Sequence, residues 1–293
     1  MKKILFYIFY FFSWLLSKLP LKIQYFKADM LYIILYYIIS YRKKVVYTNL
    51  KNSFPEKSEK ERKAIAKKFY KHLADLFIEN ITIHFIKEKE ILKRVKFTNI
   101  EILTNYYKQN KSVIAVLGHY GNWEYYLGMP LITKYLFVGV YKKLSNKLFN
   151  KLFIKTRSKF GAEPVEMHNT LRTLIKYANE KKLNFAGFVS DQTPTKSESH
   201  YWTKFLNQDT PVFLGVEKIA KKTNQPVVFL YMRKVKRGYY QVEIIKLFDN
   251  PKETKEHEIT ECHVKLLEKI IKEEPAYWLW SHRRWKHKNP NDN

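Results

Sequence analysis

Short apolar runs alternate with longer amphipathic segments through the middle of the chain. We predict that the apolar runs at residues 112–117, 136–140, 184–189, 226–232 and 239–245 are strands. Strands that alternate with helical segments are typical of an α/β fold, in which helices cover a mixed, mostly parallel sheet. Arg237 and Gly238 separate the last two runs and indicate a hairpin turn, which predicts an antiparallel edge to the sheet.

The first 23 residues have a composition of their own. Two lysines precede an uncharged run at residues 4–17, which as a helix of about 1.5 Å per residue covers roughly 21 Å. The hydrocarbon core of a bilayer is ~30 Å thick, so we expect an apolar membrane-anchor helix that lies on the membrane or only just spans it. A cleaved signal peptide is the alternative, but its small-residue cleavage site is missing. We therefore expect an anchor at residues 1–23 and a single domain at residues 24–293.

Two more segments of the N-terminal third are predicted to be helices. The apolar run at residues 30–41 is too short to span a bilayer and fits a packed or interfacial helix. In residues 58–87 the apolar positions recur at helical spacing, and Ser58 with Glu61 predicts a capping box at the start.

The charge balance points to a polyanionic partner. The 293 residues hold 54 Lys and Arg against 27 Asp and Glu, a formal net charge of +27. Nucleic acid, an anionic membrane and an acidic carrier protein would each suit this charge. Aromatic residues make up 16% of the chain, which favours a lipid–water boundary but also suits stacking on bases. Cys262 is the only cysteine, so the sequence excludes an intrachain disulfide and a cysteine-based zinc site.

The stretch VLGHYGNWEYY, residues 116–126, contains the clearest candidate chemistry. It follows a predicted buried strand and precedes a predicted helix, so His119 should lie at the carboxyl end of a strand, where α/β sheets bind ligands. Gly118 and Gly121 permit a sharp turn, and the helix start can offer N–H groups to a developing negative charge. Histidine is the usual general base near neutral pH, and Glu124 can fix its tautomer.

The same stretch carries a family resemblance. GHYGNWE resembles the HxxxxD/E motif of glycerolipid-type acyltransferases, and in particular the HxGNWE form of the late acyltransferases of bacterial lipid A biosynthesis. Four other segments resemble that family in the same order along the chain: residues 41–56 (YRKKVVYTNLKNSFPE), 188–194 (FVSDQTP), 210–228 and 278–286 (WLWSHRRWK). The resemblance therefore covers nearly the whole chain and implies a glycerolipid acyltransferase-like fold.

The resemblance implies direct attack of a lipid hydroxyl on an acyl thioester, without an acyl-enzyme. His119 would be the general base and Glu124 its orienting partner. The expected substrate-binding residues are Gly121, Asn122, Arg157, Asp191, Gln192, Arg283 and Arg284. Two alternatives stay open, since Asp191 can also simply cap a turn, and the paired arginines near the C-terminus can bind phosphate or act as interfacial anchors. Tyr120 stands where many members have a smaller or aliphatic residue, which would narrow the acceptor side.

A basic stripe follows the motif. No acidic residue occurs between Tyr125 and Ala162, whereas lysines recur every four residues at Lys143, Lys147, Lys151, Lys155 and Lys159. On a helix this spacing places them on one side. The stripe either steers an acidic carrier protein, binds anionic head groups, or is an ordinary solvated face.

We therefore expect an O-acyltransferase at the bacterial inner membrane, with its catalytic domain on the cytoplasmic face. The donor would be acyl carrier protein or coenzyme A thioester, and the acceptor a hydroxyl of a lipid A precursor or related acylated lipid. We expect anionic lipids and the carrier protein as partners, and no nucleic acid, metal or resident cofactor. The alternatives are an acyltransferase for another lipid, such as an aminolipid, and a non-catalytic basic protein that binds membrane or nucleic acid.

Overall fold

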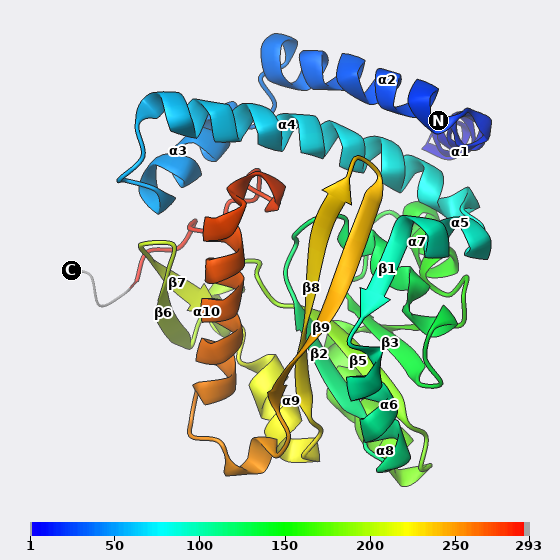
Figure 1. Ribbon diagram of the computed structural model, residues 1–293, viewed down its shortest axis with the longest axis vertical. Helices are drawn as coiled ribbons and strands as arrows, with labels where there is room; N and C mark the ends of the chain where they lie inside the picture. The colour runs from blue at the N-terminus through cyan, green and yellow to red at the C-terminus, as the bar shows by residue number, and fades with distance from the viewer. Residues whose placement is uncertain (1, 290–293) are drawn as a thin grey trace.

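The computed structural model describes residues 2–289. Within this range, seven strands form one mixed sheet, and a shorter antiparallel pair lies beside it (Figure 1). The strands of the sheet are, in spatial order, β1 (Val95–Thr98), β9 (Tyr239–Phe248), β8 (Val227–Lys236), β2 (Val113–Leu117), β5 (Asn184–Val189), β3 (Leu136–Tyr141) and β4 (Glu163–Glu166). The separate pair is β6 (Tyr201–Phe205) with β7 (Gln208–Val212).

All five predicted strands are present, and the α/β prediction is confirmed. Every neighbouring pair in the sheet is parallel except β8 and β9. These two form the expected hairpin, and Gly238 at its turn has φ +78°. The hairpin is not the edge of the sheet, because β1 pairs in parallel with the outer side of β9. β1, β4, β6 and β7 were not predicted, because they are short and partly polar.

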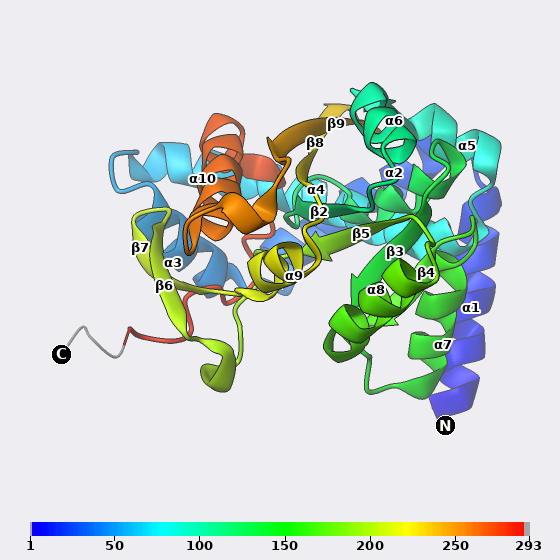
Figure 2. The ribbon, with the colours of Figure 1, turned by 90° about the horizontal axis from the view of Figure 1, so that it is seen from below.

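Consecutive side chains of β2 alternate between two hydrophobic cores. Ile114 and Val116 belong to the larger core, whereas Val113, Ala115 and Leu117 belong to the smaller one. All five residues are buried, as expected of a central strand covered on both faces. Figure 2 shows the two helical layers on either side of the sheet.

Ten α-helices are present among residues 2–289. They are α1 (Lys2–Lys18), α2 (Leu21–Ile33), α3 (Lys43–Ser53), α4 (Glu59–Thr82), α5 (Glu88–Arg94), α6 (Ile100–Lys108), α7 (Lys147–Arg157), α8 (Thr170–Asn179), α9 (Gly215–Thr223) and α10 (Glu258–Glu273). Helices α4, α8, α9 and α10 supply side chains to the larger core, and α5, α6 and the 3₁₀ helix η3 (Trp123–Leu131) to the smaller one. The capping box predicted at Ser58 and Glu61 is present and starts α4.

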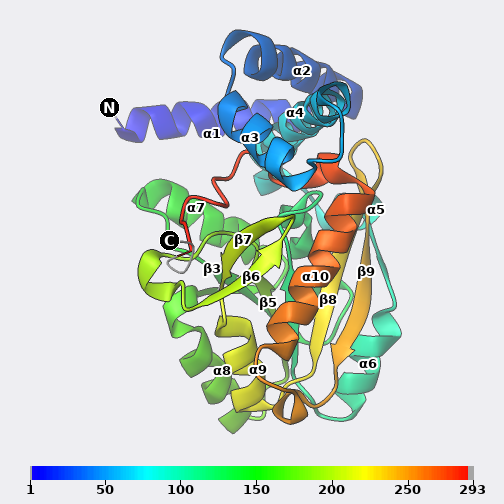
Figure 3. The same ribbon diagram turned by 90° about the vertical axis from the view of Figure 1, so that its left-hand side faces the viewer.

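Helices α1, α2 and α4 lie across the end of the sheet at which β8 terminates (Figures 1 and 3). Arg237 in the β8–β9 turn ties this layer to the sheet, because it donates to Asp75 of α4 and to Asp29 of α2, each at 2.7 Å. Residue 23, the predicted boundary of the anchor, falls inside α2.

The N-terminal run does form a helix, α1, with an apolar exposed face. Its exposed side chains include Ile4, Leu5, Ile8, Phe11 and Phe12. We predicted an apolar membrane anchor here that lies on the membrane or only just spans it. The structure does not support a spanning anchor, since in the part of the chain that it describes no helix is long and apolar enough to cross a membrane.

Candidate active site

His119 lies just beyond the carboxyl end of β2, as predicted. β2 pairs in parallel with β5, and Leu117 is in register with Val189. Beyond this pair, the backbone continues for two residues from each strand, to His119 and to Asp191, so the sheet places these two side chains next to each other. Nδ1 of His119 is 2.6 Å from Oδ1 of Asp191, and the backbone N–H of His119 donates to Oδ2 at 2.9 Å.

Asp191 is buried and accepts every hydrogen bond it makes. A third donor, Nε1 of Trp278, reaches Oδ2 at 2.7 Å. Burial raises the pKa of Asp191, but the charge of His119 and the hydrogen bonds from His119 and Trp278 outweigh it and lower the pKa to about 2. The carboxylate is therefore ionised at neutral pH and holds a proton on Nδ1 of His119.

The other ring nitrogen of His119 faces a cavity. Its Nε2 lies 3.1 Å from the side-chain nitrogen of Gln192, which can donate to it when Nδ1 carries the proton. Both residues line a cavity of about 330 Å³. The ring is thus arranged as a general base, with its basic nitrogen on the cavity side and a carboxylate on the opposite side.

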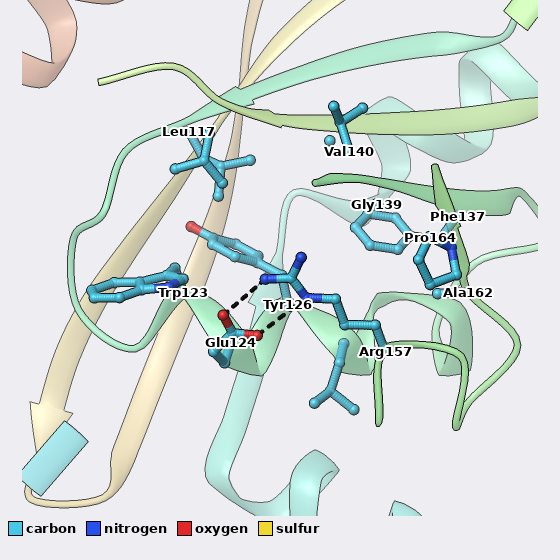
Figure 4. A pocket seen from close by; sticks show the side chains of 13 residues that line it. Leu117, Trp123, Glu124, Tyr126, Phe137, Gly139, Val140, Arg157, Ala162 and Pro164 are labelled. Atoms are coloured by element: carbon cyan, nitrogen blue, oxygen red, sulfur yellow. Dashed lines mark hydrogen bonds and ion pairs between the residues drawn. The ribbon is translucent and has the colours of Figure 1, made fainter. Parts of the chain in front are cut away.

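The predicted partner of His119, Glu124, is engaged elsewhere. Its carboxylate accepts from Arg157 of α7, at 2.9 Å from Nη2 and 3.4 Å from Nε (Figure 4). The chain turns sharply at Gly121, where φ is +64°, and Glu124 then lies in the first turn of η3 beside α7. The structure therefore differs from the prediction: Asp191 orients His119, and Glu124 forms an ion pair with Arg157.

Gly121 and Asn122 are structural rather than open to a substrate. The N–H of Gly121 donates to the carbonyl of Tyr277, and a Cβ at Gly121 would meet Met232 at 3.0 Å. The side chain of Asn122 is fully buried and caps η3 by accepting from the N–H of Glu124. Both residues were predicted to contact substrate, and the structure places them inside the protein instead. At the helix start, the N–H groups of Asn122, Glu124 and Tyr125 are likewise used inside the protein.

Asn122 also donates to Glu79 of α4, at 2.6 Å. Glu79 is 1% exposed and accepts two further hydrogen bonds, from the hydroxyls of Tyr25 on α2 and Tyr240 on β9. Burial raises the pKa of Glu79, and the hydrogen bonds from Tyr25 and Asn122 oppose this effect. One buried carboxyl group thus fixes the turn after His119 to three distant elements.

Tyr120 and Arg284 also differ from their predicted roles. Tyr120 is 4% exposed, donates to the carbonyl of Glu274 and does not line the cavity beside His119, so it does not narrow this cavity. Arg284 is 2% exposed and donates to the carbonyl of Pro211, so it is no surface phosphate ligand. Burial lowers its pKa to about 10, although Asp191 opposes the shift. Arg283 is exposed.

Three cavities meet at Arg157. It lines the cavity beside His119, a cavity of about 70 Å³ at the ends of β2, β3 and β5 (Figure 4), and a cavity of about 320 Å³ between α1, α4 and α7. Glu124 lines the second and third of these. The smaller cavity is mostly apolar and contains the small residues Gly139, Ala162 and Gly187. The ion pair therefore lies where the cavity beside the candidate base adjoins two further cavities.

The basic stripe is only partly preserved in the structure. Lys143 pairs with Glu166 at 3.2 Å, and Lys159 donates to the carbonyls of His84 and Ile86. Lys147, Lys151 and Lys155, called the α7 lysines below, are exposed on the helix that also carries Arg157.

Sequence reasoning missed two contributors to the site, Trp278 and Glu79. Trp278 belongs to the C-terminal segment in which only the two arginines were predicted to act in the site, and Glu79 looks like any glutamate of a charged helix. His72 and His263 are also buried, and nothing in the sequence around them indicates it.

Comparison with known proteins agrees with the resemblance of the motif. The profile of the family described as bacterial lipid A biosynthesis acyltransferase matches residues 1–287. A lipid A biosynthesis acyltransferase of Haemophilus influenzae is 21% identical over 245 residues, which cover 80% of this chain and 72% of the relative. A lipid A biosynthesis lauroyltransferase of Escherichia coli is 23% identical over 279 residues, 93% of this chain and 88% of the relative. The chain is therefore an acyltransferase and belongs to the bacterial lipid A biosynthesis acyltransferase family.

Proposed function

We propose that this enzyme transfers a fatty acyl chain from an acyl-carrier-protein thioester to a hydroxyl of a lipid A precursor or a related acylated lipid. The observation that carries the proposal is the 2.6 Å contact between Nδ1 of His119 and a buried, ionised Asp191, with Nε2 on the wall of a cavity. A non-catalytic binding protein has no use for this arrangement. The names of the two relatives support lipid A as the acceptor class.

In the proposed reaction the acceptor hydroxyl takes the place of Gln192 at Nε2 of His119. Nε2 removes the hydroxyl proton as the oxygen attacks the thioester carbonyl, which gives a tetrahedral oxyanion. The oxyanion collapses, the carbon–sulfur bond breaks, and the leaving thiolate takes the proton from the imidazolium. Asp191 stabilises the imidazolium throughout, since it holds the Nδ1 proton without accepting it.

Arg157 is the candidate for stabilising the oxyanion. Its guanidinium lines the same cavity as His119, and Glu124 holds it through two N–H groups. A fixed cation next to a developing negative charge stabilises the transition state more than the ground state. Glu124 is then a positioning residue that acts through Arg157, which explains why an acid follows the histidine without touching it.

The donor and the membrane use different surfaces in this proposal, the lysines of α7 and the exposed face of α1. The exposed α7 lysines suit an acidic carrier protein, since a positive surface beside the site steers a negative partner. The exposed apolar face of α1 suits the interface of the bacterial inner membrane, with the domain on the cytoplasmic face where acyl carrier protein is found.

Mass spectrometry of lipid extracts tests the proposal. Cells that express the wild-type chain should contain a lipid heavier by one acyl group than the same lipid in cells with an empty vector or with the His119→Ala variant. The mass and head group of this lipid identify the acceptor, which separates a lipid A precursor from an aminolipid. An unchanged lipid profile, with the protein folded and abundant, would refute the proposal.

A further inference from the structure

The cavity between α1, α4 and α7 is mostly apolar. Its walls include Phe9 of α1, Ile81 of α4 and Leu152 and Phe153 of α7. Its volume of about 320 Å³ is roughly twice that of an engineered apolar cavity, ~150 Å³, that binds benzene. The space is therefore large enough for several carbon atoms of a hydrocarbon chain.

The same cavity reaches the polar centre of the active site. Glu124 and Arg157 line it, so a chain bound there ends next to the ion pair beside His119. Asn80 lies on its wall as well, and no donor among the described residues reaches its buried Oδ1. An unpaired buried acceptor is costly, and an amide N–H or a hydroxyl of an acylated lipid would satisfy it.

Helix α1 contacts this cavity on one side and exposes apolar side chains on the other. On the inner side, the rings of Phe6 and Phe9 pack on Phe149 of α7, with centroids 5.3 and 5.2 Å apart. On the outer side, Leu5 and Ile8 are 60% and 47% exposed. A helix that is apolar on both sides offers a lipid a route from an interface to the cavity without a passage through water.

We propose that this cavity binds a hydrocarbon chain of the acceptor lipid, and that α1 is a wall of the acceptor site. This assignment rests on the proposed acyl transfer. The acceptor already carries acyl chains and resides in the bilayer, on the side where α1 exposes its apolar face. The donor chain, in contrast, arrives attached to a water-soluble carrier.

The test combines a cavity-filling variant with a photoreactive lipid. Ile81→Trp places a larger side chain in the cavity, and Ile65→Trp is the matched control, since Ile65 is also half-buried on α4 but lies outside the cavity. The probe is a phospholipid with a diazirine on its acyl chain, in vesicles of phosphatidylglycerol and phosphatidylethanolamine. Peptide mass spectrometry then locates the labelled residues, and circular dichroism checks that each variant is folded.

In the wild type and in Ile65→Trp we expect label at Leu152 or Phe153, and in Ile81→Trp we expect its loss. Ile81→Trp should also raise the KM for the acceptor by about tenfold, at an unchanged KM for the donor. Label confined to the outer face of α1 would overturn the assignment, and so would an increase in the donor KM alone. Labelling needs no acyl transfer, so a failure of the proposed function is distinguishable from a failure of this inference.

Discussion

Replacing Asp191 by Asn separates the structure from the motif-based expectation most sharply. The carboxylate accepts from Nδ1 and N–H of His119 and from Nε1 of Trp278. An amide has one oxygen and one NH₂ group. An Asn at this position therefore either points its NH₂ group at one of these N–H donors or forces the proton of the His119 ring from Nδ1 to Nε2. In the second case the nitrogen at the cavity can no longer act as a base.

The structure also indicates how far kcat should fall in Asp191→Asn. The pKa of Asp191 falls from 3.8 to about 2, with burial acting against the shift and His119 and Trp278 producing it. A shift of this size corresponds to about 2 kcal/mol in favour of the charged form, or roughly 30-fold in rate if the same interactions stabilise the imidazolium. The tautomer change adds to this, so kcat should fall by roughly 10²- to 10⁴-fold, the range for a lost general base.

The assay is transfer of a radiolabelled acyl group from acyl carrier protein to the lipid acceptor by purified protein in detergent. Asp209→Asn, a change of a half-exposed aspartate on β7 outside the site, is the matched control and should retain wild-type turnover. If Asp191→Asn keeps more than about a tenth of wild-type kcat while Glu124→Gln abolishes activity, Asp191 is not the orienting group of His119, and the reasoning from geometry fails.

Three other predictions follow from the described contacts. Arg157→Lys should lower kcat strongly at a nearly unchanged donor KM, because an ammonium cannot reproduce the two-point contact with Glu124. The control Arg233→Lys, on the exposed end of β8, should leave the kinetics unchanged, and equal kinetics for the two variants would remove Arg157 from catalysis. Burial lowers the pKa of His263 from 6.5 to about 4, so between these values the unfolded chain binds a proton that the folded chain does not, and the free energy of unfolding should fall as the pH drops through this window. In urea unfolding at pH 7 and pH 5, His263→Leu should show a smaller fall in the free energy of unfolding than the wild type, and an identical fall would contradict the assignment. Reversing the α7 lysines to Glu should raise the KM for acyl carrier protein and weaken its salt dependence while sparing a small acyl thioester, and equal impairment of both donors would point to a lipid contact instead.

The sequence was sufficient to place His119 at the carboxyl end of a strand, because strand, turn and helix follow one another along the chain. It was insufficient for Asp191, since the partnership depends on β2 and β5 being neighbours in register, although 72 residues separate the two side chains. Spacing within a motif favours the nearer acid, Glu124, but a left-handed residue at Gly121 redirects the backbone between them.

Burial of polar side chains was equally hidden. Asn122 and Arg284 look like surface or ligand-binding residues in the sequence, and only the packing of α4, β7 and the C-terminal segment encloses them. The five central strands were predictable because each contains an apolar run. The short strands β6 and β7 contain Lys204, Gln208 and Asp209, whose polarity conceals the pairing.

The hydrogen bond from Trp278 to Asp191 has a consequence for the synthesis of the protein. A ribosome releases His119 and Asp191 long before residue 278, and Tyr240, which holds Glu79 and through it the turn at Asn122, also emerges late. Contacts between residues so distant in sequence form slowly and only once both segments are available. A growing or prematurely terminated chain therefore has the candidate base and its carboxylate but lacks Trp278, so we expect acyl transfer only when nearly the whole polypeptide has been translated.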